Sequence, residues 1–417
     1  MKRKVAVIGG GASGMMAAIE AAGQGAEVTI YEHMRLGKKI LATGNGKCNL
    51  GNMHMTPECF FSHNMERVNN CLKRFGIAET ITFFEDMGLC IKEKNGYLYP
   101  LSEQAAVVQQ VLEAQVKRLD ISVITECKVQ EIQTMEKQRP GRRVLLMTEN
   151  GKEFYDAVIL ACGSKAAPKT GSDGSGYTFA KQLGHKLLPV LPSLVQLKCS
   201  DSFCKSIAGI RCDANIHIYD RTQDREKLLC QEQGELQLTD YGISGIPVFQ
   251  LSGLVNRYLY DNKKAALVAK IDFLPQMSNE EFRNFVQKRM KLIKEDRTVE
   301  EFFLGILNQK LMQLFMKLVG LSPQAPVSKV SKEKLQQVFS LCKCLEMHIT
   351  GSNGFENAQV CTGGVDLNEV TDDLESIYSE NVYFVGELLD VDGRCGGYNL
   401  QWAWTSGYIA GHAAGAK

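Results

Sequence analysis

The feature that most constrains the fold of this chain is a glycine turn near its start. Residues 5–8 form a short apolar run typical of a strand, and Gly9, Gly11 and Gly14 follow at G-x-G-x-x-G spacing. A helical stretch of small and apolar residues and a second strand-like run then lead to Glu32. This order is typical of a dinucleotide-binding βαβ unit, in which the pyrophosphate lies at the helix N-terminus. An acid at position 32 suits ribose hydroxyls rather than a 2′-phosphate, so the turn predicts FAD or NAD and not NADP.

The balance of charges excludes several classes of partner. The 417 residues carry 48 Lys and Arg against 47 Asp and Glu, so no net field draws the chain to nucleic acid or to a membrane. No window is long and apolar enough to span a bilayer, and no signal-peptide layout precedes the first strand. We therefore expect a cytoplasmic protein of roughly two or three domains. The 14 cysteines lack C-x-x-C pairs, which argues against a disulfide scaffold and a metal site.

Two further glycine-rich segments have the composition of ligand-binding loops. Residues 35–52 hold four glycines, which permit close approach of the backbone to a cofactor. The hydrogen-bonding side chains of this segment are Thr43, Asn45 and Asn49. Near the other end, residues 393–397 form a second glycine loop before a helix that we expect to begin at about Asn399. The first turn of such a helix would stabilise negative charge on a reduced cofactor.

Two apolar strand-like runs end beside residues suited to the same ligand. Residues 156–160 lead to Gly163, and ligands of open α/β sheets bind beyond the carboxyl ends of strands. We therefore expect Gly163 near the cofactor. The run at 382–385 ends at Gly386, Glu387 and Asp390.

The patterns predict an α/β fold in which both chain ends form one nucleotide-binding domain. Its first part is expected at 1–190 and its second at 346–417, with an insert at 191–345. Within the insert, short alternating segments predict an antiparallel β unit at about 191–240, and helical periodicity predicts a cap at about 241–340. The apolar stripe of the cap fits either core packing or the wall of an apolar substrate pocket.

Six motifs together resemble those of one known family. They are IGGGASGMMAA at 8–18, LATGNGKCNLGN at 41–52, GSDGSGY at 171–177, YGISG at 241–245, CTGGV at 361–365 and GELLDVDGRCGGYNLQWAW at 386–404. They resemble the bacterial HI0933-type flavoproteins, also called NAD(P)/FAD-dependent or aminoacetone-oxidase-like oxidoreductases, which include a bile-acid-inducible ene-reductase. The resemblance covers the whole chain and implies a Rossmann-like FAD-binding domain with an inserted β unit and a helical cap. Asp240, where the family often has histidine, and Cys162-Gly163-Ser164, where it tends to have Thr-Gly-Gly, depart from the pattern.

Carried over by position, the resemblance implies that both chain ends bind FAD non-covalently. The positions are Gly9, Gly11, Ala12, Ser13, Gly14, Glu32, Lys39, Thr43, Asn45, Asn49, Val129, Gly386, Glu387, Asp390, Asn399, Leu400 and Gln401. Val129 would be a backbone contact to adenine, and Asp390 would reach the ribityl or pyrophosphate region. The candidates that face the substrate are Tyr398, Arg394 and Cys395. The alternative is that Arg394 holds the loop and Cys395 fills space.

The favoured hypothesis is an FAD-dependent oxidoreductase in which NADH or NADPH drives reduction of an unsaturated, apolar, bile-acid-like small molecule by hydride transfer. There is no second nucleotide fingerprint, so NAD(P)H would enter from the flavin face. One alternative is an oxidase of small amines that uses oxygen. Another is a flavin-bearing protein without catalysis, or an accessory of RNA modification, although the charge balance argues against nucleic acid. No catalytic acid or base stands out, and the oligomeric state is not indicated.

Overall fold

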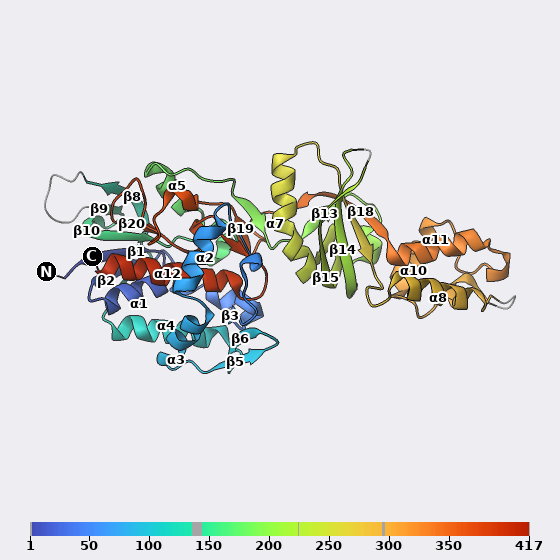
Figure 1. Cartoon of the computed structure of the whole chain (residues 1–417), viewed down its shortest axis with the longest axis horizontal. Helices are drawn as coiled ribbons and strands as arrows, with labels where there is room; N and C mark the ends of the chain where they lie inside the picture. The colour runs from blue at the N-terminus through green and yellow to red at the C-terminus, as the bar shows by residue number, and fades with distance from the viewer. Residues whose placement is uncertain (1, 136–143, 224, 294–296, 417) are drawn as a thin grey trace. The chain divides into compact units, whose positions relative to one another are not determined.

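A computed structural model describes residues 2–135, 144–223, 225–293 and 297–416. Its internal contacts divide the chain into two compact units (Figure 1). Unit 1 comprises Met1–Ser193 and Phe355–Lys417, and unit 2 comprises Leu194–Gly354. The second division follows strand β18 (Leu345–Ser352), whereas the boundary expected from the sequence, between residues 345 and 346, falls at the start of that strand.

The centre of unit 1 is a five-stranded parallel sheet in the order β20-β11-β1-β2-β7. Its strands are β1 (Lys4–Ile8), β2 (Glu27–Tyr31), β7 (Ser122–Ile124), β11 (Ala157–Leu160) and β20 (Val382–Phe384). The residues of β11 and β20 are all buried, as expected of a parallel sheet covered on both faces. Strand β20 pairs with β11, so the C-terminal part of the chain completes the sheet that the N-terminal part begins. The predicted Rossmann-like α/β fold is confirmed.

Two helices from opposite chain ends pack closely against each other in unit 1. They are α1 (Ala12–Gly23) and α12 (Tyr398–Ala416), drawn in blue and red in Figure 1. Every fourth residue on one face of α12 is a glycine: Gly407, Gly411 and Gly415. A Cβ at any of these glycines would lie 2.4–2.7 Å from a carbonyl oxygen of α1, which is too close for any side chain. The glycine stripe therefore lets the two backbones touch and ties the chain ends together.

Smaller elements surround this core. The remaining strands of unit 1 are β3 (Gly51–Asn52), β4 (Phe60–Phe61), β5 (Ile91–Lys94), β6 (Tyr97–Pro100), β8 (Val129–Thr134), β9 (Val144–Thr148), β10 (Gly151–Tyr155), β12 (Leu191–Ser193), β19 (Val360–Thr362) and β21 (Asp392–Gly393). Its other α-helices are α2 (Met65–Arg74), α3 (Ile77–Asp86), α4 (Ala105–Arg118) and α5 (Ser175–Gln182). Strand β21 pairs antiparallel with β4, which brings the glycine loop near the C-terminus against the segment that follows residue 59.

Unit 2 contains a closed six-stranded barrel in the order β13-β16-β15-β14-β17-β18. The strands are β13 (Leu197–Cys199), β14 (Arg211–Asp220), β15 (Lys227–Thr239), β16 (Gly242–Gly245), β17 (Leu267–Asp272) and β18. Both β16 and β17 fall within the range assigned to the helical cap. The run at 266–273 already indicates a strand where β17 lies, whereas the sequence predicts only a turn where β16 lies. The helices are α6 (Cys204–Ile207), α7 (Ile246–Asp261), α8 (Asn279–Met290), α9 (Val299–Phe303), α10 (Gln309–Leu318) and α11 (Lys332–Lys343).

The YGISG motif has a structural role in the barrel. Gly242 has φ +153°, and a Cβ on it would lie 2.2 Å from the carbonyl oxygen of Leu197 on β13. Gly245 has φ +103°, and its Cβ would lie 2.3 Å from the carbonyl oxygen of Glu235 on β15. Both glycines allow β16 to fit between its neighbours, and Pro247 then occupies the first turn of α7.

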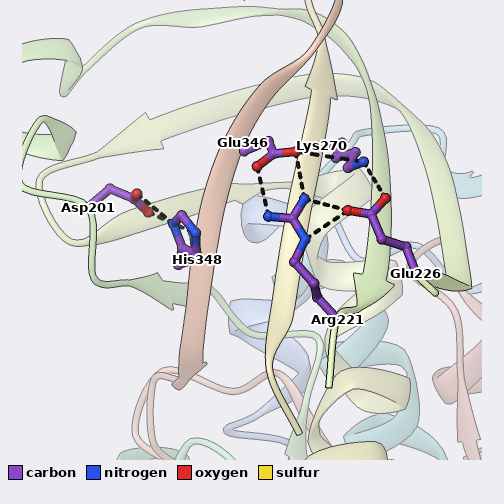
Figure 2. Close-up of polar contacts among 6 residues, drawn as sticks. All are labelled: Asp201, Arg221, Glu226, Lys270, Glu346 and His348. Carbon is purple, nitrogen blue, oxygen red and sulfur yellow. Dashed lines mark hydrogen bonds and ion pairs between the residues drawn. The ribbon is translucent and has the colours of Figure 1, made fainter. Parts of the chain in front are cut away.

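The barrel carries a network of opposite charges beside the paired strands β17 and β18 (Figure 2). Arg221 donates to both carboxylate oxygens of Glu346, at 3.0 and 2.7 Å, and its Nε donates to Glu226 at 2.7 Å. Lys270 pairs with Glu226 and lies 3.6 Å from Glu346. These side chains are about one-quarter to one-third exposed, and water therefore weakens their attraction. The network links the paired strands β17 and β18 to Arg221 and Glu226, which lie between β14 and β15.

Candidate functional site

The glycine turn after β1 has the shape of a phosphate-binding turn. Gly9 has φ +107°, and a Cβ there would lie 2.4 Å from the carbonyl oxygen of Ala161. A Cβ on Gly14 would lie 1.9 Å from the carbonyl oxygen of Gly9, whereas one on Gly11 would meet no atom within 4 Å among the described residues. Gly9 and Gly14 are therefore required by packing, and Gly11 faces open space. No described side chain caps α1, so its first N–H groups, those of Ala12 and Ser13 included, remain oriented toward that space.

Glu32 is held against the same turn. Its Oε2 accepts from the backbone N–H of Gly10 at 2.7 Å, and its Oε1 accepts from that of Met34 at 2.7 Å. The residue is buried at the carboxyl end of β2, and its backbone carbonyl accepts from Cys127 N–H at 3.3 Å. That contact brings the segment leading to Val129, the first residue of β8, beside Glu32. A carboxylate fixed in this way can bind the two hydroxyls of a ribose.

Glu387 forms a second fixed carboxylate near the start of α1. Lys39 Nζ donates to its two oxygens at 2.8 and 2.9 Å, and Ser164 Oγ donates at 2.7 Å. The neighbouring Gly386 has φ +68°, and a Cβ on it would lie 2.5 Å from Ser13 Oγ. Helix α12 fixes this turn, because Gly386 N–H donates to Ser406 Oγ and Trp402 Nε1 donates to Gly386 O. These contacts place the two chain ends around one space.

The residues predicted to bind FAD through loops differ in their burial and in their hydrogen bonds. Thr43 Oγ1 donates to Ile40 O at 2.6 Å, while Asn45 is exposed with φ +53°. Asn49 is buried, and its Oδ1 has no hydrogen-bond partner among the described residues. Gly163 has φ +70° and would carry a Cβ 2.7 Å from Ser172 Oγ. Of these side chains, Asn49 is the one with an unused buried acceptor.

The start of α12 meets the loop that carries Asn49. A Cβ on Gly397 would lie 2.8 Å from Asn49 Oδ1 and 2.7 Å from Gly51 O. Gln401 is fully buried; its Nε2 donates to Thr80 Oγ1 at 2.8 Å, but its Oε1 has no partner among the described residues. That Oε1 lies 3.4 Å from where a Cβ on Gly51 would be. Two buried acceptors that need a donor therefore lie beside the Gly51–Gly397 contact.

Two other predicted residues of this helix have local structural contacts. Asn399 Oδ1 accepts from Gly393 N–H at 2.8 Å, and its Nδ2 donates to Gly393 O at 2.8 Å and to Arg394 O at 3.3 Å. Its side chain thus shapes the glycine loop at the start of α12. Leu400 is partly buried against the core of unit 1. The N–H of Gln401 is already bonded to Gly397 O at 2.9 Å.

The three candidate substrate-facing residues share the segment that follows β21. Burial first, then a hydrogen bond with Cys59, raises the pKa of Tyr398, whose ring also contacts Phe60 edge-on. Burial raises the pKa of Cys395 to about 12, so its sulfur is a thiol rather than a thiolate near neutral pH. Arg394 is exposed, and its N–H donates to Cys59 O at 2.9 Å. Their contact with a substrate stays a prediction.

Asp390, predicted to reach the ribityl or pyrophosphate region of FAD, already uses one of its two carboxylate oxygens within the protein. Its Oδ2 accepts from His63 N–H at 2.8 Å and pairs with His63 Nδ1 at 2.9 Å. Its Oδ1 is buried without a partner among the described residues. Burial raises the pKa of Asp390, and the hydrogen bonds from His63 oppose that rise. The sequence carried no signal for His63, which belongs to no motif with a recognisable spacing, and it marked Ser164 only as a departure from the family pattern.

Fold and site together define a Rossmann-type dinucleotide-binding protein. The residues fit an FAD molecule: uncapped N–H groups face open space at Gly11, a fixed carboxylate stands at Glu32, and buried acceptors at Asn49 and Gln401 can take the N–H group of a flavin ring. No helix of the described residues is long and apolar enough to cross a membrane. All 14 cysteines are unpaired with one another.

Comparison with known proteins gives the family. The model of the HI0933-like protein Rossmann domain matches residues 3–413. The chain is 41% identical over 419 residues, 99% of each chain, to a 3-dehydro-bile acid delta(4,6)-reductase of Clostridium scindens. It is 28% identical over 409 residues, 96% of each chain, to a ribosomal RNA dihydrouridine synthase of Haemophilus influenzae. A solved structure of a flavocytochrome c3 fumarate reductase matches at 13% identity and a TM-score of 0.47, covering 99% of this chain and 78% of that one.

The chain belongs to the HI0933-like family, as its motifs predict. It is an FAD-type oxidoreductase.

Proposed function

We propose that this protein uses NADH or NADPH to reduce a carbon–carbon double bond conjugated to a ketone in a steroid-like, bile-acid-type molecule. The supporting observation is the 41% identity, over 99% of both chains, to a reductase named for such a substrate. The bound flavin would accept a hydride from the nicotinamide and pass it to the substrate. The chain's own residues would hold FAD through the turn at Gly11, through Glu32 and through Asn49.

A second candidate shares the chemistry. The relatives named as ribosomal RNA dihydrouridine synthases are 28% and 27% identical over 409 residues. Dihydrouridine is uridine with its C5–C6 double bond saturated, and that bond is conjugated to the C4 carbonyl. Both named products therefore arise by reduction of an alkene conjugated to a carbonyl. The neutral charge balance of this chain favours the steroid over the RNA.

The test compares electron acceptors under identical conditions. The purified protein, loaded with FAD, is given NADH or NADPH without oxygen together with a 3-oxo-Δ4 bile acid or with unmodified ribosomal RNA. The proposal predicts nicotinamide oxidation and a steroid product heavier by two hydrogens. Dihydrouridine formation in the RNA, with no steroid product, would establish the second candidate instead. A third mixture holds a small amine with oxygen and no nicotinamide, and turnover in that mixture alone would show the oxidase alternative and refute both.

A further inference from the structure

One histidine of unit 1 combines an exposed ring with a buried carboxylate behind it. His63 follows β4, and its side chain is 49% exposed, whereas that of Asp390 is 1% exposed. The carboxylate can only accept, so the 2.9 Å contact to Asp390 Oδ2 is a hydrogen bond donated by Nδ1. The backbone N–H of His63 donates to the same oxygen at 2.8 Å, and Ser62 Oγ lies at 3.4 Å. This arrangement fixes the ring and its tautomer and leaves Nε2 as the second nitrogen.

Other histidines with similar contacts lack part of this arrangement. His412 Nδ1 lies 2.9 Å from Glu20 Oε1, and the ring is 48% exposed, but both residues lie on helix surfaces away from the glycine loops. His348 pairs with Asp201 at 2.9 Å on the outer face of the barrel (Figure 2). At His63 the carboxylate is buried and has a second oxygen without a described partner. Asp390 is also the most deeply buried of the three carboxylates, since the side chains of Glu20 and Asp201 are 14% and 10% exposed.

His63 lies close in the fold to the segment that carries the candidate substrate-facing residues Arg394 and Cys395. Strand β4 pairs with β21, with Phe61 opposite Asp392 and Phe60 opposite Gly393. His63 thus stands two residues beyond the strand pair that opens the loop of Arg394 and Cys395. Asp390 belongs to the turn that begins at Gly386 beside α1. His63 therefore contacts Asp390, which follows the Gly386 turn, and it also follows the strand that pairs with the start of the loop of Arg394 and Cys395.

We propose that His63 is the general acid of the reaction, and that its Nε2–H donates a proton to the carbonyl oxygen of the conjugated ketone. Asp390 is the positioning residue that orients the ring. This inference rests on the proposed function, since it requires a substrate with a carbonyl conjugated to the double bond. It applies to the steroid and equally to the C4 carbonyl of uridine.

The step balances as follows. A hydride that entered with NADH or NADPH adds to the β-carbon, and the alkene electron pair forms a new double bond between the α-carbon and the carbonyl carbon. The carbonyl π pair takes the proton from Nε2, which gives an enol. The α-carbon then takes a proton from water, and the enol O–H returns its proton to Nε2. The net change is one NAD(P)H and one proton consumed for each double bond saturated.

The experiment uses His63→Asn in the FAD-loaded full-length protein. Asparagine keeps an N–H near the position of Nδ1 for Asp390 but has no counterpart of Nε2. His412→Asn is the matched control, since it removes an equally exposed ring that also faces a carboxylate at 2.9 Å. The probe is a 3-oxo-Δ4 bile acid labelled with ¹³C at the carbonyl carbon. Its carbonyl chemical shift is read on the oxidised protein, where no turnover occurs.

The expected result is a downfield carbonyl shift on binding to the wild type and to His412→Asn, and its loss with His63→Asn. In stopped-flow mixing, reduction of the bound flavin by NADPH should stay within about 2-fold of wild type, because His63 takes no part in that step. Reoxidation by the steroid should slow about 100-fold, the usual contribution of a general acid. His63→Gln, whose amide nitrogen reaches toward the Nε2 position, should restore part of the shift but not the rate.

Two outcomes separate failure of this inference from failure of the proposed function. A His63→Asn protein with the wild-type shift and the wild-type reoxidation rate overturns the role of His63 while the function stands. A wild-type protein that neither binds nor is reoxidised by the steroid refutes the proposed substrate, and the assignment of a carbonyl donor falls with it. If His63→Asn does not retain FAD, the same comparison is made with His63→Gln, for which slow reoxidation supports the role and a wild-type rate overturns it.

Discussion

Replacement of Gly411 by Ala tests the contact that joins the two chain ends. The new Cβ would lie 2.4 Å from Ala17 O and 2.9 Å from Ala17 Cα, whereas ordinary contact begins at 3.4 Å. Helix α12 would therefore have to move away from α1 by about 1 Å, since the obstructing atoms are backbone and cannot rotate away. Overpacking of this kind costs about 1–3 kcal/mol, and the better helix propensity of alanine offsets up to about 1 kcal/mol. We expect a net loss of about 1–2 kcal/mol in the free energy of unfolding.

The assay is denaturant unfolding of the apoprotein followed by tryptophan fluorescence. Both tryptophans of the chain, Trp402 and Trp404, are buried in α12, so the signal reports this helix directly. Gly23→Ala is the matched control, because Gly23 ends α1 and a Cβ on it would meet no atom within 4 Å among the described residues. It should leave stability unchanged or raise it. A Gly411→Ala protein as stable as the control would refute the close packing of the two helices.

Three further predictions concern other parts of the molecule. Glu32→Gln leaves one acceptor oxygen for two backbone N–H groups, so the FAD dissociation constant should rise about 10- to 100-fold in a flavin-fluorescence titration; an unchanged constant would contradict the role of this carboxylate. Burial raises the pKa of Cys395 to about 12, so the fraction of this residue present as thiolate becomes large only as the pH approaches 12. Iodoacetamide at pH 8 should therefore alkylate the exposed Cys90 well before Cys395, as followed by mass spectrometry. The reverse order of alkylation would refute this. Arg221→Met should lower stability by no more than about 1 kcal/mol, with a smaller loss in 1 M salt; a larger, salt-insensitive loss would show that the Glu346 contact acts as a buried pair.

The nucleotide-binding part of the fold could be predicted because its signals are local. The strand at residues 5–8, the glycines that follow and the acid at position 32 are close in sequence, and their spacing has one physical explanation. The glycine loop before α12 was recognisable for the same reason, and the helix begins at Tyr398, within one residue of the expected start.

The barrel could not be predicted in full because its closure depends on pairing between distant strands. Strand β18 pairs with β13 and β17, yet Ser352 lies 155 positions after its partner Leu197. Alternation in β14 and β15 reveals an amphipathic β hairpin, but alternation does not say whether a sheet closes. The four-residue β16 begins and ends with a glycine and has too few side chains to show a strand pattern.

The pairing of His63 with Asp390 was invisible for a related reason. The two residues lie 327 positions apart, and each belongs to a short turn with no periodic pattern. Their contact follows from the two-residue pairing of β4 with β21, which no propensity predicts. The FAD contacts carried over from the family stay predictions, and among them Asn49 and Gln401 gain a physical argument from their unused buried acceptors.

The most direct test of the account is a single turnover of the purified protein without oxygen. The visible absorption of the bound flavin is bleached with one equivalent of NADH or NADPH, and a 3-oxo-Δ4 bile acid is then added. The account predicts that the oxidised flavin band returns while one equivalent of the saturated ketone forms. It would be contradicted by a flavin that neither nicotinamide bleaches, or by a band that returns only when oxygen is admitted.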